Sequence, residues 1–400
     1  MKRLLLAGGG HAHLHVLKTL AEAPWPGVEV VLVSPFRRQL YSGMVPGWMA
    51  GHYRLDQCAA AVGPLAVAAG ARFVEDVVTG IDAGQRLVHT RSAGSFPYDV
   101  LSLDTGAEVD DACLAATGAR LASIRPLEGF VSEWAQAIDD FRQRGTARVV
   151  VVGGGAAGVE LALAARFRLA AEVGTDVGAE VDTKVGTEVG TEVDTNAVRV
   201  TLVAAAGLLP GYGRRVVARV ARALAERGVD LVHGRAVGCA AGVRLDSGVV
   251  LAADCVIAAT GVRPAAWLAA SGLALADDGF VAVGDGQASI SHAQVFAAGD
   301  VASRVDRPHA KSGVYAVRAG PVLAANLRRA LAGLPPLPYP PQRRSLYLLA
   351  TGPRDAIVSW GGLSAGGYWA WRWKDWIDRR FLRRYEPSAT QQAATTREAG

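Results

Sequence analysis

The chain has 400 residues, of which 50% are hydrophobic and 20% charged, and this composition excludes a disordered protein. A chain of this length forms about two or three domains and needs neither a disulfide nor a metal to fold. The four cysteines form no Cys-x-x-Cys pair, which excludes a disulfide scaffold and a cysteine zinc site and favours a reducing compartment. The net charge of +5 would suit an anionic partner, but every stretch as long as a membrane span contains charged residues, so we expect no transmembrane helix.

The chain begins with a strand, a glycine turn and a helix. The apolar run 4–7 is broken at once by Gly8, Gly9 and Gly10, so it predicts a first strand and not a signal peptide. A helix is expected over residues 11–23 and a strand over 28–33. Such a turn lets backbone N–H groups and a helix N-terminus face a pyrophosphate, which indicates dinucleotide binding.

A second unit repeats this order. The strand 149–152 leads into the complete pattern Gly153-x-Gly155-x-x-Gly158, followed by a helix over 159–171 and a strand over 198–203. Residues 172–195, between that helix and that strand, parse as six mostly acidic tetrads. Gly and Thr are poor helix formers, so we expect a solvated loop there, with a partner-binding tract as the alternative.

Both units depart from the usual way of holding a ribose. His13 stands at the last glycine position of the first turn, and Ser34 stands where an acid usually holds the ribose of the adenosine. The second return strand ends in Ala204, with Arg214 and Arg215 just beyond. Since Ala204 would not repel a 2′-phosphate, NADH and NADPH both stay open.

A third block follows at residues 279–331. It contains a strand-like run at 295–298, then Gly299 and Asp300, and a helix expected over 312–331. The proline-rich segment 335–341 reads as a stiff linker. Residues 344–363 alternate like strands, residues 366–385 read as a helix, and the tail from 387 is polar and expected to be disordered.

Two dinucleotide units and a late Ala-Ala-Gly-Asp at 297–300 resemble the two-domain flavoproteins of the pyridine nucleotide–disulfide oxidoreductase superfamily. Further matching motifs are 103–106, 153–160 and 259–264, and the resemblance covers about residues 1–335. It implies an α/β fold with two Rossmann-like dinucleotide-binding domains and a C-terminal α+β extension. The expected divisions are 1–110 with 279–335 for FAD, 111–278 for NAD(P)H with the insertion 172–195, 336–386 for the extension, and 387–400 for the tail.

The resemblance also implies where the cofactors bind. The residues expected at FAD are Gly8, Gly10, His11, Ser34, Tyr41, Thr105, Gly106, Gly299 and Asp300. Those expected at NADH or NADPH are Gly153, Gly155, Gly158, Glu160, Gly261 and Arg263. Glu160 would orient the nicotinamide, Pro46 would line the flavin ring, and Lys311 would place positive charge beside the reduced flavin, unless it is a plain surface lysine. We expect no metal site, because alternate histidines at 11, 13 and 15 of a helix do not converge.

The electron acceptor is less directly indicated. The disulfide reductases and sulfide:quinone reductases of the superfamily use paired cysteines near the flavin, and Cys58 is solitary. The nearest class is then the type II NADH dehydrogenases, which reduce quinones. Residues 41–47 and 311–318 are also similar to a flavoprotein often fused to selenide, water dikinase. An alternative is therefore a soluble NAD(P)H-dependent reductase for a selenium or sulfur compound, acting with a partner in selenophosphate synthesis. A non-enzymatic FAD-binding scaffold is a further alternative.

The C-terminal helix suggests a surface partner. Residues 369–385 hold four of the nine tryptophans and carry six basic and two acidic side chains. Trp369, Trp373, Trp376, Ile377 and Phe381 are predicted to share one broad face, which would suit a membrane headgroup layer. The same face could instead serve internal packing or a homodimer. We expect no nucleic-acid partner and a cytoplasmic protein, peripheral to the inner face of the cell membrane.

Overall fold

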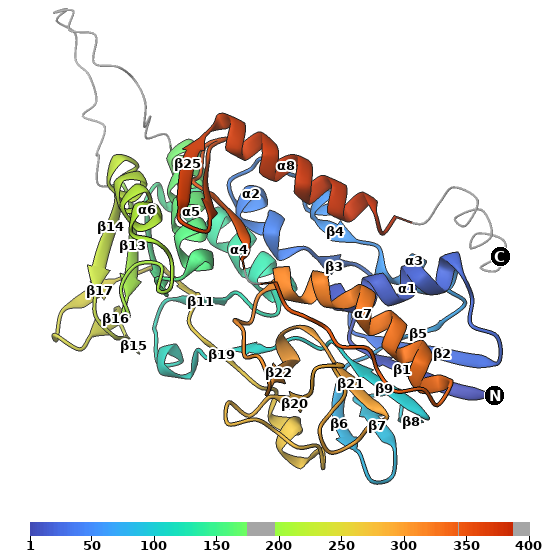
Figure 1. Cartoon of the computed structure of the whole chain (residues 1–400). Coiled ribbons are helices and arrows are strands. Elements are labelled where there is room, and N and C mark those ends of the chain that lie inside the picture. Colours follow the sequence, from blue (N-terminus) through green and yellow to red (C-terminus); the bar gives the residue numbers. More distant parts are fainter. Residues whose placement is uncertain (174–196, 343, 387–400) are drawn as a thin grey trace, which may run out of the picture.

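The computed structural model of the chain describes residues 1–173, 197–342 and 344–386 (Figure 1). It has two five-stranded parallel sheets, and this confirms the predicted α/β class. Most of the tetrad segment and the whole tail fall outside the described residues. Glu172 and Val173, predicted to open that loop, instead complete the preceding helix.

The first sheet has the strand order β21-β9-β1-β2-β5. Leu4 and Leu6 of β1 point into a core shared with helices α1 and α7, whereas Leu5 and Ala7 point into a core beneath β6 and β7. Because both faces are covered, β1 reads as a continuous apolar run. The strands are β1 (Lys2–Ala7), β2 (Val28–Ser34), β5 (Arg72–Glu75), β9 (Val100–Leu103) and β21 (Val295–Ala297).

Helices cover one face of this sheet and an antiparallel sheet lies on the other (Figure 1). The helices are α1 (His11–Glu22), α3 (Val62–Ala68) and α7 (Gly313–Leu331), and the antiparallel strands are β6 (Val78–Asp82), β7 (Leu87–Thr90) and β8 (Ser95–Pro97). The glycine Gly320 lets α7 approach α1, since a Cβ there would lie 2.8 Å from the Cβ of His15.

The second sheet has the order β11-β18-β12-β13-β14. Its strands are β11 (Arg120–Ser123), β12 (Ala147–Val152), β13 (Val198–Ala204), β14 (Val229–His233) and β18 (Cys255–Ala258). It carries the helices α4 (Leu127–Arg144), α5 (Ala156–Val173) and α6 (Arg214–Glu226) and a small sheet of β15 (Ala236–Cys239), β16 (Gly242–Leu245) and β17 (Val250–Ala252).

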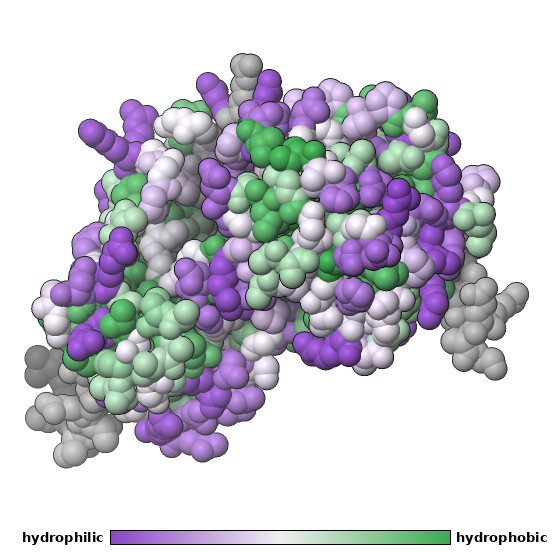
Figure 2. All heavy atoms as spheres, turned by 90° about the horizontal axis from the view of Figure 1, so that it is seen from below, coloured by the Kyte–Doolittle hydropathy of each residue, from purple (hydrophilic) through white to green (hydrophobic). Residues whose placement is uncertain are grey.

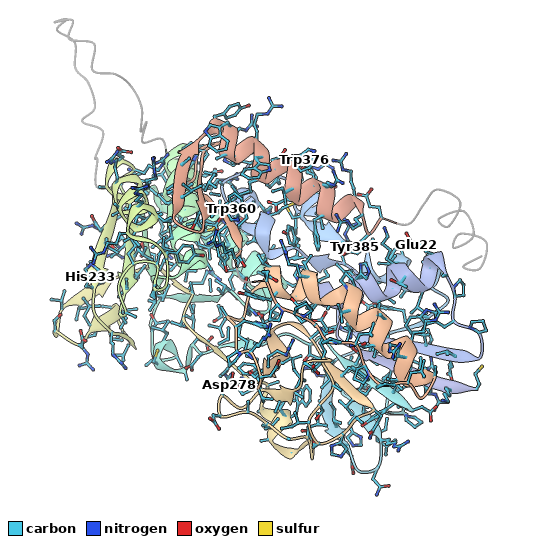
Figure 3. All side chains as sticks on the ribbon, viewed as in Figure 1. Glu22, His233, Asp278, Trp360, Trp376 and Tyr385 are labelled. Carbon is cyan, nitrogen blue, oxygen red and sulfur yellow. The ribbon has the colours of Figure 1, made fainter. Side chains whose placement is uncertain are left out.

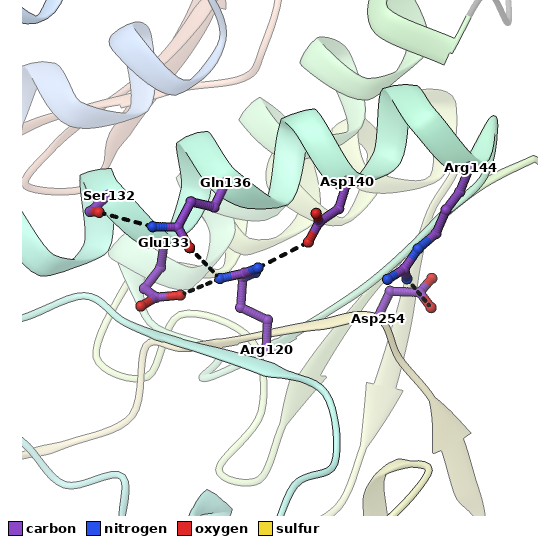
Figure 4. Close-up of polar contacts among 7 residues, drawn as sticks. All are labelled: Arg120, Ser132, Glu133, Gln136, Asp140, Arg144 and Asp254. Carbon is purple, nitrogen blue, oxygen red and sulfur yellow. Dashed lines mark hydrogen bonds and ion pairs between the residues drawn. The ribbon is translucent and has the colours of Figure 1, made fainter.

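Arg120 of β11 forms hydrogen bonds and ion pairs with helix α4 (Figure 4). The guanidinium of Arg120 donates to Glu133 and Gln136 at 2.8 Å each and to Asp140 at 2.9 Å. These three acceptors are spaced three and four residues apart, so they lie along one face of the helix. Arg144, at the end of α4, reaches Asp254 beside β18 at 3.5 Å.

The C-terminal segment forms an antiparallel sheet and a long helix. The sheet consists of β23 (Leu346–Ala350), β24 (Ala356–Trp360) and β25 (Leu363–Gly367), and the helix is α8 (Tyr368–Arg383). Both agree with the strands and the helix predicted for this region. Figure 1 shows α8 running along the top of the molecule, from above α5 to beyond α2.

Short elements connect these layers. They are α2 (Val45–Met49), β3 (Gln39–Leu40) with β4 (Ala59–Ala60), β10 (Glu108–Val109) with β19 (Val262–Arg263), and β20 (Val281–Val283) with β22 (Ala302–Arg304). Single 3-10 turns lie at Ser42–Met44, Leu55–Cys58, Ala112–Leu114, Ala266–Ala270 and Gly299–Val301.

The predicted aromatic face of α8 is only partly right. Trp369, Trp373 and Trp376 are exposed by 52, 38 and 50%. Phe381, predicted on the same face, is buried and stacks on Tyr41 with ring centroids 4.5 Å apart. The buried face of α8 instead carries Ala370, Lys374, Asp378, Phe381 and Leu382. Lys374 and Asp378, one turn apart, form an ion pair on this face.

Candidate functional site

The first glycine turn is closely packed against the end of β9. Gly8 has a φ of +94°, and its N–H donates to the carbonyl of Val33 at 2.8 Å. A Cβ at Gly8 would overlap the backbone of Asp104, and a Cβ at Gly10 would overlap the Asp104 carboxyl group. Glycine is therefore required at both positions. Helix α1 begins directly after this turn, at His11.

His13 replaces the last glycine of the turn without disturbing it. Its Nδ1 lies 2.6 Å from the carbonyl oxygen of Gly8, so it donates there, and its Nε2 accepts from the Ser102 hydroxyl at 2.8 Å. Burial lowers the pKa of His13 to about 4, which keeps the ring neutral. The His13 side chain thus links the glycine turn to β9 through hydrogen bonds with Gly8 and Ser102.

The acidic residue predicted at the flavin, Asp300, lies close to the same turn. It is 9% exposed and accepts a hydrogen bond from Arg125 at 2.5 Å. Gly299, with a φ of +70°, would place a Cβ 2.6 Å from Oδ1 of Asp104. Asp104, Gly299 and Asp300 therefore converge on the N-terminus of α1, although they are far apart in sequence.

Other predicted residues gather around this point. Ser34 ends β2, and its hydroxyl lies 2.8 Å from where a Cβ of Gly9 would be. Tyr41 contacts His11 with ring centroids 5.5 Å apart. Thr105 and Gly106 lie two and three residues beyond β9, and Gly106 has a φ of +75°. Pro46 is buried in the first turn of α2.

The second glycine turn has an open position. A Cβ at Gly153 would overlap the carbonyl of Ala259, and one at Gly158 would overlap the carbonyl of Gly153. A Cβ at Gly155, in contrast, would meet nothing within 4 Å. The N–H of Leu209 donates to the carbonyl of Gly154 at 2.8 Å and closes one side of the turn. The turn can therefore accept a ligand at Gly155.

Two predicted site residues, Arg263 and Lys311, make contacts with other parts of the protein. Arg263, on β19, pairs with Glu108 at 2.9 Å, although neighbouring Gly261 is open on its Cα side. Lys311 donates to Ala302 and Ser303 at 2.7 Å each, and its ammonium lies 3.7 Å from the ring centroid of Phe280. Burial lowers the pKa of Lys311, which is therefore not a plain surface lysine.

Glu160 faces the C-terminal segment. It is the fifth residue of α5, beyond the first turn where we expected it, and its Oε1 accepts from the N–H of Ala350 at 2.8 Å. Burial raises the pKa of Glu160 to about 7, and the charge of Lys374 opposes this shift. Lys374 in turn donates to Asp378 at 2.6 Å and to the carbonyl of Gly43 at 2.5 Å.

Among known protein families, one model matches most of the chain: pyridine nucleotide-disulphide oxidoreductase, over residues 2–320. The chain belongs to this family. Members of the family are FAD-containing oxidoreductases that use NADH or NADPH, and this one is such an enzyme. No curated protein matches the chain.

Three solved structures show how widely this oxidoreductase fold is shared. The sulfide:quinone oxidoreductase of Aquifex aeolicus is 17% identical, with a TM-score of 0.75 over 96% of this chain and 91% of that one. A ferredoxin reductase of Rhodopseudomonas palustris is 21% identical, with a TM-score of 0.69 over 90% and 82%. The water-forming NADH oxidase of Lactobacillus brevis is 20% identical, with a TM-score of 0.68 over 90% and 75%. At these identities the likeness is one of fold.

The residues of this oxidoreductase fit FAD at the first turn. Nε2 of His11 and Oγ1 of Thr105 are buried and have no hydrogen-bond partner among the described residues. Buried polar atoms are normally satisfied, so both indicate a polar ligand. The N-terminus of α1 above Gly8 and Gly10 suits the pyrophosphate, and the open Gly155 suits that of NAD(P)H.

Sequence reasoning missed Asp104 and Arg125 as members of this site. Asp104 follows β9 and Arg125 lies two residues beyond β11, and both strands belong to parallel sheets. Ligands of such sheets bind at the carboxyl ends of the strands, so this position was the available signal. For metals the described residues contain no cluster of three or more suitable side chains.

Proposed function

We propose that the enzyme takes a hydride from NADH or NADPH and passes the electrons directly to a quinone. Bound FAD would supply the chemistry, since it can accept a hydride and return two electrons. The chain would contribute binding and orientation: Gly8, Gly10 and Asp300 for FAD, and Gly153, Gly155 and Gly158 for the nicotinamide nucleotide. Proximity and alignment then suffice for transfer, without a side-chain nucleophile.

The division of the chain into cofactor domains is part of this proposal. We assign residues 1–110 and 279–335 to FAD and 111–278 to NAD(P)H. The support is that β21, late in the sequence, pairs with β9 in the first sheet, whereas the second sheet is built from β11, β12, β13, β14 and β18.

Direct transfer to the acceptor is supported by the cysteines. All four are free, and Cys58 is the one on the loop that also carries Tyr41. Burial raises the pKa of the Cys58 thiol to about 12, so it stays protonated near neutral pH. A protonated thiol without a partner cannot relay an electron pair as a dithiol does.

The observation that carries the quinone assignment is the packing of α8 against the segment 41–44, which leads into α2. Its inner face places Phe381 on Tyr41, which in turn contacts His11 at the first turn. Its outer face exposes Trp369, Trp373 and Trp376. One helix thus joins the flavin region to an apolar aromatic surface, which suits an acceptor that arrives in lipid.

We also propose that this outer face lies in the headgroup layer of a membrane. Exposed arginines at 372, 380 and 383 flank the tryptophans, and tryptophan with arginine suits that layer. Figure 3 shows Trp376 on α8 and Tyr385 beyond its end. The face opposite α8, seen in Figure 2, mixes hydrophilic and hydrophobic residues over most of its area. No helix among the described residues is long and apolar enough to cross a membrane.

The test is an anaerobic titration of the purified flavoprotein with NADH and then NADPH, followed at the flavin absorption bands. We expect either nucleotide to bleach the bands and a short-chain quinone to restore them within turnover time. Recovery with a selenium or sulfur compound but not with a quinone would overturn the quinone assignment and favour a soluble reductase with a partner in selenophosphate synthesis. If neither NADH nor NADPH changes the flavin absorption bands, the proposed reaction itself is overturned.

A further inference from the structure

Asp104 packs against three glycines of the first cofactor site, two at its side chain and one at its backbone. A Cβ on Gly10 would overlap its carboxyl carbon, one on Gly299 would lie 2.6 Å from Oδ1, and one on Gly8 would overlap its backbone. The side chain is 4% exposed. The glycines that shape the turn thus make room for a carboxyl group as well as for a ligand.

The two oxygens of this carboxyl group have different surroundings. Oδ2 accepts from the N–H groups of Ala12 at 2.7 Å and His13 at 3.0 Å. Both N–H groups belong to the first turn of α1, where they have no partner within the helix and normally attract an anion. Oδ1 lies between Gly10 and Gly299 and accepts no hydrogen bond from the described residues.

The charges around Asp104 disfavour its ionised form. Burial is the main cause that raises its pKa to about 7, the two N–H groups oppose the shift, and the Asp300 carboxylate adds to it. The guanidinium of Arg125 is paired with Asp300. Burial lowers the pKa values of His11 and His13 to about 4, so neither ring offers a positive charge at neutral pH.

We propose that Asp104 is protonated when FAD is bound and donates a hydrogen bond from Oδ1 to an oxygen of the cofactor, so that FAD binding takes up a proton. The diphosphate would bring two negative charges to a site that already holds Asp104 and Asp300. Protonation of Asp104 would be favourable for two reasons. It removes a negative charge close to the diphosphate, and it turns Oδ1 into a hydrogen-bond donor for an oxygen of the cofactor.

The proposal predicts how FAD affinity depends on pH. Unliganded Asp104 is mostly ionised above pH 7, and bound FAD raises its pKa further. Binding therefore consumes a proton in that range, and the dissociation constant should rise by up to about tenfold per pH unit between pH 7 and 9. Below pH 6 the carboxyl is protonated in both states and the dependence on Asp104 vanishes.

The experiment measures FAD released from diluted holoenzyme by its fluorescence, at a series of pH values. Asp104→Asn keeps an acceptor for Ala12 and His13 and offers a permanent donor, so we expect its FAD affinity to be flat over pH 7–9. Asp110→Asn removes the same charge at an exposed position six residues on, and it should keep the wild-type slope. Equal slopes in wild type and Asp104→Asn, or no slope in wild type, would overturn the proposal.

A second readout covers the case in which Asp104→Asn does not fold. The infrared spectrum of wild-type holoenzyme at pH 8 should contain a carboxylic acid C=O band that shifts in D2O and weakens when FAD is removed. No change in that band on FAD removal contradicts the proposal. Neither readout involves NAD(P)H or the electron acceptor, so failure of the quinone assignment leaves this inference intact.

Discussion

Arg125 and Asp300 form an ion pair at 2.5 Å, although 175 positions separate them in the sequence. Arg125 follows β11 of the second sheet, whereas Asp300 follows β21 of the first. The pair therefore links the ends of strands from the two sheets beside the first glycine turn, where we propose that FAD binds. Asp300 is nearly buried and Arg125 is about a third exposed, so the guanidinium closes the site from the solvent side.

Replacing Arg125 by Gln should weaken FAD binding. The Asp300 carboxylate would lose its charged partner beside a diphosphate, and a hydrogen bond to a charged group contributes about 1.5–3 kcal/mol. We expect FAD to dissociate about 10- to 100-fold more readily. Equilibrium dialysis of the holoenzyme measures this. Arg91→Gln, which removes a charge at an exposed position, is the control, and equal retention of FAD in both variants contradicts the argument.

Gly155→Trp should abolish oxidation of NADH and NADPH while FAD stays bound. A Cβ at Gly155 meets no protein atom, so the ring occupies the space that the nucleotide needs without straining the fold. Flavin absorbance and thermal unfolding should match wild type, and the rate of flavin reduction by NADH should fall at least about 1,000-fold. Gly362→Trp, at another open and exposed glycine, controls for the added surface ring. Loss of FAD from Gly155→Trp would show that the cofactor sites are assigned the wrong way round.

The two glycine turns could be read from the sequence because their spacing follows from local backbone geometry. Contacts between distant segments could not. The periodicity of residues 369–385 grouped Phe381 with the tryptophans, since a hydrophobic pattern does not register a buried ion pair. Charged side chains such as Lys374 and Asp378 are rarely buried unless they are paired, and here they are 9 and 5% exposed. The contact of Glu160 with β23 could not be read either, because the Ala350 N–H that donates to its carboxylate lies 190 residues away in the sequence.

Lys374→Met should destabilise the enzyme by about 3–5 kcal/mol, because it leaves the Asp378 carboxylate buried without a partner. Asp378 would keep only the Tyr41 hydroxyl, which donates to it. Adding Asp378→Leu to Lys374→Met should recover much of the loss, since replacing a whole buried pair by apolar side chains is often close to neutral. Urea unfolding of the two variants measures the free energies. A double variant less stable than the single variant would show that Asp378 stabilises the fold without Lys374.

The pKa of Glu160 predicts a pH dependence of stability. Burial raises it from 4.5 to about 7, so the folded state holds this proton more tightly than the unfolded chain does. The stabilisation is fully present below pH 4.5 and is lost as the pH rises through 7. Glu160→Gln keeps an acceptor for Ala350, and the drop in unfolding free energy between pH 5 and 8 should shrink by about 1–3 kcal/mol. Glu226→Gln, at an exposed position, should leave the decrease in unfolding free energy between pH 5 and 8 unchanged. If the decrease is as large in Glu160→Gln as in wild type, another group is responsible for it.

Replacing Trp369, Trp373 and Trp376 together by Gln should detach the enzyme from lipid. Together with Tyr368, which stays in place, their rings are the large exposed aromatic groups of α8, and flanking arginines add attraction to anionic headgroups. In flotation assays with vesicles containing anionic lipid, we expect binding to fall at least about tenfold, while NADH oxidation with a water-soluble acceptor is retained. Val249→Ser with Val250→Ser removes exposed apolar side chains on the β16–β17 turn and should leave vesicle binding unchanged. The wild-type enzyme could instead fail to bind vesicles and sediment as a dimer, while the tryptophan variant sediments as a monomer. The aromatic face would then be an interface between two copies of the chain.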